Sequence, residues 1–125
     1  LLGVESAISV LSAALLGQST GGEHVRPVCD LVGRATKDLK AGAVLEAVGH
    51  HHTIDGVEGL LVESCAAVGS GPAPYYLMSG CKLIRDVPTG TILPCEALDI
   101  PAESTMWRLR AEQDATFLSG AKSAA

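Results

Sequence analysis

The sequence has few aromatic residues and no cluster of positive charge. Its 125 residues include one Trp, two Tyr and one Phe, while hydrophobic types together make up 47%. A core of Val, Leu, Ile and Ala is ordinary for a single globular domain of this length. The formal net charge is −5, and the basic residues form no run. Because nucleic acids and anionic membranes are bound through a basic face, we expect neither as a partner.

Long apolar runs and paired cysteines are also missing. No segment approaches the roughly 18 apolar residues of a transmembrane helix. The cysteines at 29, 65, 81 and 95 form no Cys-x-x-Cys pair, so their spacing predicts neither a zinc knuckle nor a thioredoxin-type site. Sparse cysteines suit a reducing compartment, so we expect a cytoplasmic protein in which most of these thiols are buried. A nucleophilic Cys81 or Cys95 would need a base such as His51, and the spacing does not support one.

Helices are predicted at both ends of the chain. Apolar residues at positions 4, 7, 8, 11, 14 and 15 are spaced by three and four, which predicts an amphipathic helix over 4–16 that ends at Gly17. Residues 103–118 predict a second helix, whose start is marked by Ser104 or Pro101 and which packs through Met106, Leu109 and Phe117.

Between these helices the sequence predicts short strands joined by loops rich in Gly and Pro. Strands are predicted at residues 28–35, 43–45, 60–63 and 91–93, a loop at 64–74 and one helical turn at 94–98. No crossover helices lie between the strands, so a parallel α/β sheet is excluded. We therefore expect a mainly β domain with flanking helices.

A short pattern occurs twice in the middle of the sequence. Residues 35–45 and 83–93 align at a shift of 48 residues, and both read basic–Asp–aliphatic–x–x–Gly–x–β-branched–Leu. Such an internal repeat predicts a duplicated β unit. In each copy an Asp (Asp38, Asp86) and a Gly at positive φ (Gly42, Gly90) predict a turn, in which the Asp bonds amides just after it. Because both copies need the Asp, a structural role is favoured over general acid–base catalysis.

The two motifs, Lys37–Gly42 and Arg85–Gly90, resemble the signature halves of the SAF domain family. This resemblance covers roughly residues 28–100 and implies a SAF/β-clip core of short strands with a pseudo-twofold repeat. Three flanking segments, at 9–15, 80–83 and 107–113, resemble the C-terminal part of homoserine-dehydrogenase-like NAD(P)-dependent oxidoreductases, a group that includes deoxyxylulose-phosphate-reductoisomerase-like proteins.

The resemblance implies a division of the parent protein. Residues 1–27 would be an N-terminal helix and linker from a missing upstream domain, 28–100 the SAF/β-clip domain, and 101–125 a C-terminal helix and tail. The start at Leu1 instead of Met also predicts a piece of a longer chain. NAD or NADP would be held by an upstream Rossmann domain of the same chain, because no G-x-G-x-x-G motif occurs here.

No catalytic residue can therefore be assigned, and we expect this piece to be inactive by itself and to belong to a homo-oligomer. Two alternatives remain open. The chain is a module that binds a sugar acid or carbohydrate, in a cleft lined by residues 49–59 and the second repeat, or it is a purely structural interaction domain.

One cluster has the chemistry of metal ligands. His50, His51 and His52 are followed by Asp55. On a strand, His50 and His52 would share one face and with Asp55 or His24 would supply the three or four ligands that Zn²⁺ requires. The competing interpretation is an exposed loop between glycines, and it is the favoured one.

Overall fold

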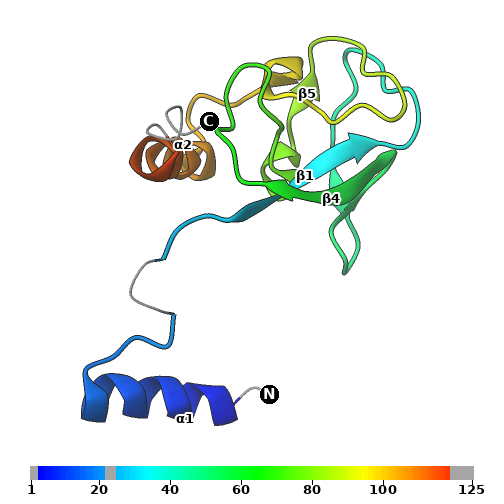
Figure 1. The fold of residues 1–125 in the computed structure, drawn as a ribbon. Coiled ribbons are helices and arrows are strands. Elements are labelled where there is room, and N and C mark those ends of the chain that lie inside the picture. Colours follow the sequence, from blue (N-terminus) through cyan, green and yellow to red (C-terminus); the bar gives the residue numbers. More distant parts are fainter. Residues whose placement is uncertain (1–2, 22–24, 119–125) are drawn as a thin grey trace.

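The computed structural model describes residues 3–21 and 25–118. Within them, two α-helices flank a four-stranded antiparallel sheet and a two-stranded antiparallel sheet (Figure 1), so the expected β domain with flanking helices is confirmed at this level. The helical elements are α1 (Val4–Leu11), the π-helical η1 (Ser12–Leu16), the 3₁₀ turns η2 (Tyr75–Met78) and η3 (Cys95–Ala97), and α2 (Thr105–Phe117). The strands are β1 (Cys29–Ala35), β2 (Ala47–Val48), β3 (Thr53–Ile54), β4 (Val57–Glu63), β5 (Lys82–Leu83) and β6 (Leu98–Asp99).

The larger sheet has the strand order β1-β4-β3-β2. β1 and β4 pair along their whole length, from Cys29 opposite Glu63 to Ala35 opposite Val57, and the predicted strand at 28–35 is confirmed. The strands predicted at 43–45 and 91–93 are wrong in extent, because each segment makes only an isolated bridge, Val44 with Lys82 and Ile92 with Arg34. Both lie beside tight turns, which leave too little extended backbone for a ladder.

The core lies between the large sheet and the Gly/Pro-rich segments that fold over it. Its largest fully buried side chains are aliphatic or sulfur-containing: Met78, Leu83, Leu93, Val32 and Cys81. Where β1 passes beneath η2, a Cβ on Gly33 would lie 2.6 Å from the Met78 Cε. It would also lie 2.9 Å from the Val57 Cγ1, so a larger residue there would force these side chains to shift.

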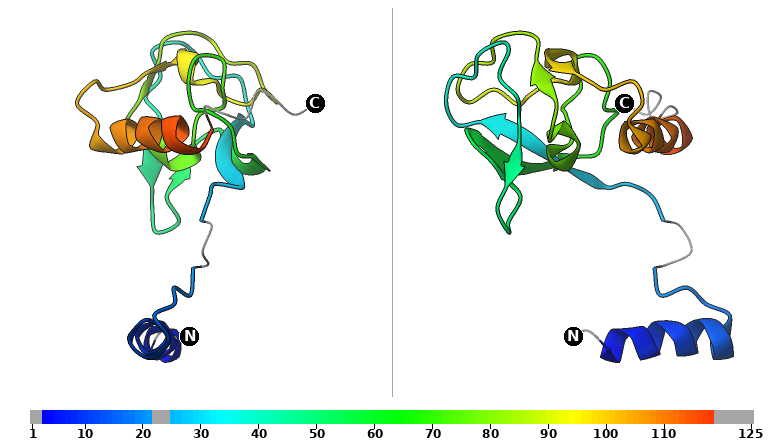
Figure 2. Two further views of the ribbon diagram at one scale, coloured as in Figure 1. Left: turned by 60° about the vertical axis from the view of Figure 1, so that its left-hand side comes forward. Right: turned by 180° about the vertical axis from the view of Figure 1, so that it is seen from behind.

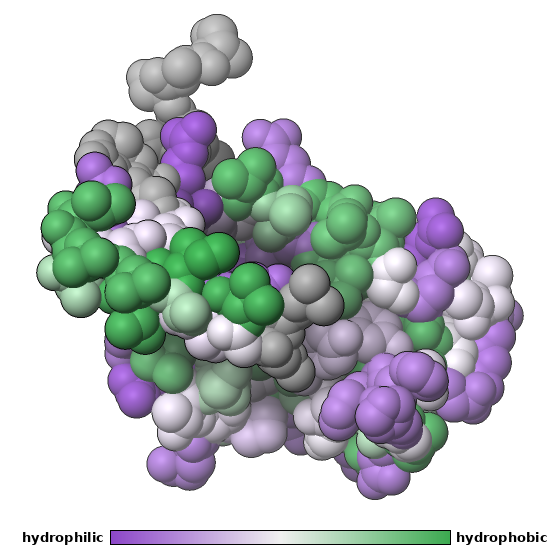
Figure 3. All heavy atoms as spheres, turned by 90° about the horizontal axis from the view of Figure 1, so that it is seen from below, coloured by the Kyte–Doolittle hydropathy of each residue, from purple (hydrophilic) through white to green (hydrophobic). Residues whose placement is uncertain are grey.

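The N-terminal helix is formed as predicted. Gly17 adopts φ 62°, the left-handed conformation expected of a terminating glycine, directly after η1. Its apolar stripe, however, packs on nothing in the described residues: Ile8, Leu11 and Leu15 are all more than half exposed. All views in Figures 1 and 2 place α1 away from the β-rich part, and Figure 3 shows hydrophobic residues gathered over it.

Of the two predicted starts of the C-terminal helix, the structure has Ser104, which is the N-cap and whose hydroxyl accepts from the Trp107 amide. The predicted packing positions are wrong. Met106, Leu109 and Phe117 are exposed, while Trp107 and Asp114 are buried. The inward face of α2 is held by an ion pair instead of by an apolar stripe, as described below. Neither helix in the described part of the chain is long and apolar enough to cross a membrane.

Candidate functional site

The two repeated motifs meet along their backbones. Leu39 and Val87, which follow the two motif aspartates, exchange a pair of backbone hydrogen bonds of 2.9 Å each. Their side chains are both buried in the core. This contact brings together two segments that are 48 residues apart in the chain.

Each motif aspartate binds the turn of the other motif. The Asp38 Oδ1 accepts from the Thr89 backbone N–H at 2.9 Å and from the Thr89 hydroxyl at 3.0 Å. In the reverse direction, the Asp86 Oδ1 accepts from the Ala41 N–H at 2.9 Å, and its Oδ2 accepts from the Lys40 Nζ at 2.8 Å. The expectation that each aspartate bonds the amides just after it is therefore wrong. The opposing turn supplies the donors, because the Leu39–Val87 contact places it alongside.

The predicted turn glycines are confirmed. Gly42 has φ 90° and Gly90 has φ 82°, and both positive values are costly for any residue with a Cβ. Their amides make matching contacts, Gly42 to the Leu83 carbonyl and Gly90 to the Ala35 carbonyl, each 2.7 Å long. A further matching pair runs from the Leu45 amide to the Cys81 carbonyl and from the Leu93 amide to the Gly33 carbonyl, both 2.9 Å.

The charges at this junction favour ionised carboxylates. The pKa of Asp38 is lowered, first by the Thr89 amide and then by its hydroxyl. The pKa of Asp86 is lowered by the Ala41 amide and by Lys40, whose own pKa is raised by the same bond. A carboxylate that stays ionised and is already engaged by amides is a poor general acid or base at neutral pH. The cavity between the motifs, about 110 Å³, is also small.

The histidine cluster is not assembled as a metal site. Within the described part of the chain, no group of three or more His, Cys, Asp or Glu side chains is placed to hold a metal ion. The ring of His50 contacts that of the next residue edge-on, with centroids 5.2 Å apart, and His52 is exposed. The Asp55 carboxylate accepts a hydrogen bond from the Lys37 Nζ at 2.6 Å. His24 lies outside the described residues.

The cysteines differ in exposure. Cys81 and Cys95 are buried as expected, Cys65 is partly buried, and Cys29 is exposed. Burial raises the pKa of Cys81, and it raises the pKa of Cys95 to about 11. Both thiols are therefore protonated at neutral pH and are weak nucleophiles.

A buried charged cluster at α2 was not foreseen from the sequence. Arg110 forms a two-pronged ion pair with Asp30 of β1, with N···O distances of 2.7 and 2.8 Å. Its Nε donates to Asp114 at 2.7 Å, and an Nη donates to the Cys65 carbonyl at 2.8 Å. The second oxygen of Asp114 accepts from the Ala67 amide. These contacts fasten α2 to β1 and to the loop that follows β4.

The pKa of Asp30 results from opposing effects. Burial raises it, but the hydrogen bonds from Arg110 and Ser64 and the charge of Arg110 outweigh burial, so the pKa is lowered overall. The Arg110 pKa is raised, chiefly by the bond to Asp30. The i,i+4 spacing of Arg110 and Asp114 was the one local signal of this cluster. The role of Asp30, 80 residues away, left no signal in the sequence pattern.

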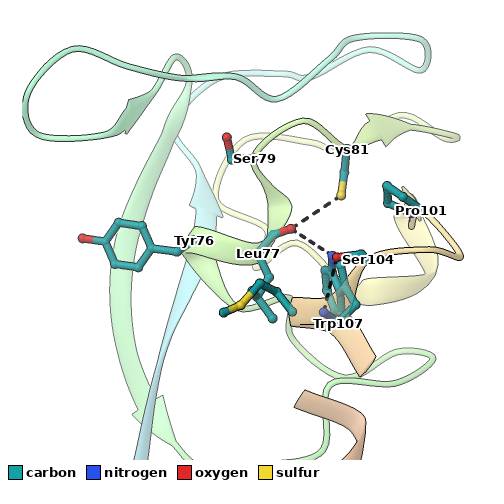
Figure 4. Close-up of a pocket in the computed structure, with 8 residues that line it drawn as sticks. Tyr76, Leu77, Ser79, Cys81, Pro101, Ser104 and Trp107 are labelled. Carbon is teal, nitrogen blue, oxygen red and sulfur yellow. Dashed lines mark hydrogen bonds between the residues drawn. The ribbon is translucent and has the colours of Figure 1, made fainter. Parts of the chain in front are cut away.

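A second cavity of about 150 Å³ lies between η2 and the start of α2 (Figure 4). The carbonyl of Leu77 accepts both from the Trp107 Nε1 at 2.9 Å and from the Cys81 Sγ at 3.6 Å. Figure 4 shows the ring of Tyr76 pointing away from these groups. Among the described residues the lining contains no Lys or Arg: it consists of Tyr76, Leu77, Ser79, Cys81, Pro101, Ser104, Met106 and Trp107.

Comparison with known proteins leaves the family open. No protein-family model matches this sequence, and no curated protein is significantly similar to it.

Proposed function

We propose that the chain is a SAF-type β-clip domain in the C-terminal part of a cytoplasmic, homoserine-dehydrogenase-like NAD(P)-dependent oxidoreductase. The observation that supports the β-clip part of the proposal is the reciprocal binding of each motif aspartate to the other motif's turn, while the oxidoreductase part rests on the resemblance of the flanking segments. The contacts Asp38–Thr89 and Asp86–Ala41 are equivalent under the 48-residue shift, because Asp86 corresponds to Asp38 and Thr89 corresponds to Ala41. The two glycine bonds and the Leu45 and Leu93 bonds repeat with the same offset. We infer that residues 28–100 are two copies of one β unit related by a pseudo-twofold.

In this proposal the repeated motifs are structural and the chemistry belongs to another part of the protein. The carboxylates of Asp38 and Asp86 accept hydrogen bonds from backbone amides, and these bonds stabilise the two turns. A dinucleotide needs a glycine-rich turn between a strand and a helix N-terminus. Among the described residues, β6 leads into α2 through residues 100–104, which contain no glycine. This connection does not fit NAD or NADP, and in this proposal the cofactor belongs to an upstream Rossmann domain.

The domain would serve the catalytic part by packing against it, by contact between subunits, or by closing over its substrate. The exposed apolar stripe of α1 supports this role, because a helix with such a stripe gains most of its stability from packing on a partner. Within residues 1–27, α1 and the segment after it would connect the upstream domain to the β-clip domain at residues 28–100.

The alternative of a module that binds a sugar acid or carbohydrate, in a cleft lined by residues 49–59 and the second repeat, stays a prediction, and the cavity in Figure 4, which lies elsewhere, adds no support to it. An acidic sugar is normally held by Arg or Lys. The cavity in Figure 4 has neither in its lining, and its indole and thiol donors are already engaged by the Leu77 carbonyl.

The test has two arms. Thermal unfolding of the chain alone, with NADH or NADPH present at saturating levels, is expected to show no shift in midpoint. A response at micromolar cofactor would overturn the assignment of the cofactor to another domain. In the second arm, the coding sequence upstream of Leu1 is read. A strand–G-x-G-x-x-G–helix pattern there supports the proposal, and its absence overturns it.

A further inference from the structure

One edge of the large sheet is open. β4 pairs with β1 along its whole length, but β3 reaches it only at Ile54 opposite Val57. Beyond that bridge, no strand lies on the far side of β4 among the described residues. Figure 1 shows β1 and β4 side by side in the β-rich part.

The register identifies the backbone groups on this open edge. Hydrogen bonds close the β1–β4 ladder at Ser64 N–H to Val28 O and at Thr36 N–H to Gly56 O. In an antiparallel pair, hydrogen-bonded and non-hydrogen-bonded positions alternate. The backbone N–H and C=O groups of the even-numbered residues of β4 therefore point toward β1. Those of the odd-numbered residues point away from β1, toward the open edge.

The outward-facing residues beyond the Val57 bridge are Gly59, Leu61 and Glu63. In the part of the chain that the structure describes, their N–H and C=O groups have no backbone partner. The outward groups of β1 are occupied near its end, where Gly33 N–H donates to Ala73 O and Ala35 N–H donates to Thr91 O.

This edge carries only part of the usual protection against pairing. Natural sheets guard open edges with charged side chains, above all Lys, and with Pro or a bulge; residues 57–63 contain Glu58 and Glu63 but neither Lys nor Pro. The Leu61 side chain is 68% exposed. Glu58 is held by the Arg34 Nε at 2.8 Å.

We propose that the outer edge of β4 pairs with the same edge of a second copy of this chain. The two strands would run antiparallel about a twofold axis at Leu61, which extends the sheet across the dimer. Each outward residue would face an outward residue of the partner, so each of the pairs would exchange two N–H···O bonds. This inference concerns assembly and does not depend on the proposed function.

The charge pattern is compatible with a second copy in this register. With the axis at Leu61, Leu61 faces the partner's Leu61, Leu60 faces the partner's Val62, and Glu63 faces the partner's Gly59. No two carboxylates oppose one another, and the central pairs are aliphatic. An axis at Glu63 would place like charges directly opposite. An axis at Gly59 is blocked by the bridge between Ile54 and Val57. The edge is therefore complementary to itself.

The test measures the mass of the chain by light scattering and sedimentation over micromolar to millimolar concentrations. We expect a monomer–dimer equilibrium that Leu61→Lys weakens at least about tenfold, because two ammonium groups then meet at the axis. Leu61→Glu should do the same. An equimolar mixture of the two variants should dimerise again, since Lys then faces Glu. Ile84→Lys, at a residue 59% exposed elsewhere on the surface, is the matched control and should leave the equilibrium unchanged.

Amide hydrogen exchange gives a second readout that does not depend on substitution. The N–H groups of Gly59, Leu61 and Glu63 should exchange more slowly as the concentration rises. A chain that stays monomeric to millimolar concentration would overturn the proposal. So would a dimer that survives Leu61→Lys but is lost with Leu11→Glu, because α1 would then form the interface. Mixing that fails to restore the dimer would overturn the register.

Discussion

Removing the charge of Arg110 should destabilise the domain more than any change at an exposed ion pair. The side chains of Arg110, Asp30 and Asp114 are only 10%, 12% and 7% exposed. Arg110→Met leaves two carboxylates in this cluster without their cation and the Cys65 carbonyl without one donor. Breaking a buried pair from one side costs about 3 kcal/mol or more, a large share of the roughly 5–15 kcal/mol by which domains are stable.

The measurement is urea unfolding followed by the fluorescence of Trp107, the one tryptophan in the sequence. Arg108→Met is the matched control, because its pair with Glu112 lies on the same helix but is about 60% exposed on both sides. That change should cost less than about 1 kcal/mol. Adding Asp30→Asn to Arg110→Met should recover part of the loss, since a neutral amide is less costly to bury. Equal losses for Arg110→Met and Arg108→Met would refute the claim that this cluster holds α2.

Three further results are expected. Because the pKa of Asp30 is lowered by folding from its usual 3.8, its stabilisation is present above that value and is lost as the pH falls through the lower pKa of the folded state. The urea midpoint should therefore fall as the pH is lowered below about 4, and less steeply in Asp30→Asn. An alkylating thiol reagent should modify the exposed Cys29 well before the buried Cys95, whose pKa is about 11; equal rates would contradict this, and the rates are read by mass spectrometry. Gly33→Ala should lower the free energy of unfolding by about 1–3 kcal/mol, because the new Cβ overlaps Met78, and an unchanged urea midpoint would contradict that packing.

Local signals predicted the elements that depend on neighbouring residues. The terminating Gly17, the N-cap Ser104 and the positive φ of Gly42 and Gly90 all follow from the backbone preferences of one residue and its neighbours. Those preferences are present in the unfolded chain as well as in the folded one. They could therefore be recognised from the sequence without knowing the fold.

The contacts that were missed are between residues distant in the chain. The partner of Asp38 is Thr89, 51 residues away, so a rule about amides just after an aspartate predicted the wrong donor. The face of α2 was misassigned because the prediction equated burial with apolar side chains. Burying Arg110 is possible only because Asp30 reaches it from β1.

The edge of β4 shows the same limit. Its sequence predicts a strand over 60–63, and that strand is present as part of a longer one. Which side of it remains unpaired depends on how far β3 extends, and β3 ends at Ile54 because the chain turns at once into β4.

The central claim is that each motif aspartate stabilises the turn of the other motif. The most direct measurement is residue-resolved amide hydrogen exchange in Asp38→Ala and Asp86→Ala. Asp38→Ala should speed exchange at Thr89 and leave Ala41 near its original rate, while Asp86→Ala should do the reverse. Asp55→Ala, which removes an exposed carboxylate paired with Lys37, should affect neither amide. Faster exchange at Ala41 in Asp38→Ala, with Thr89 unchanged, would show that each aspartate binds its own turn and would contradict the account.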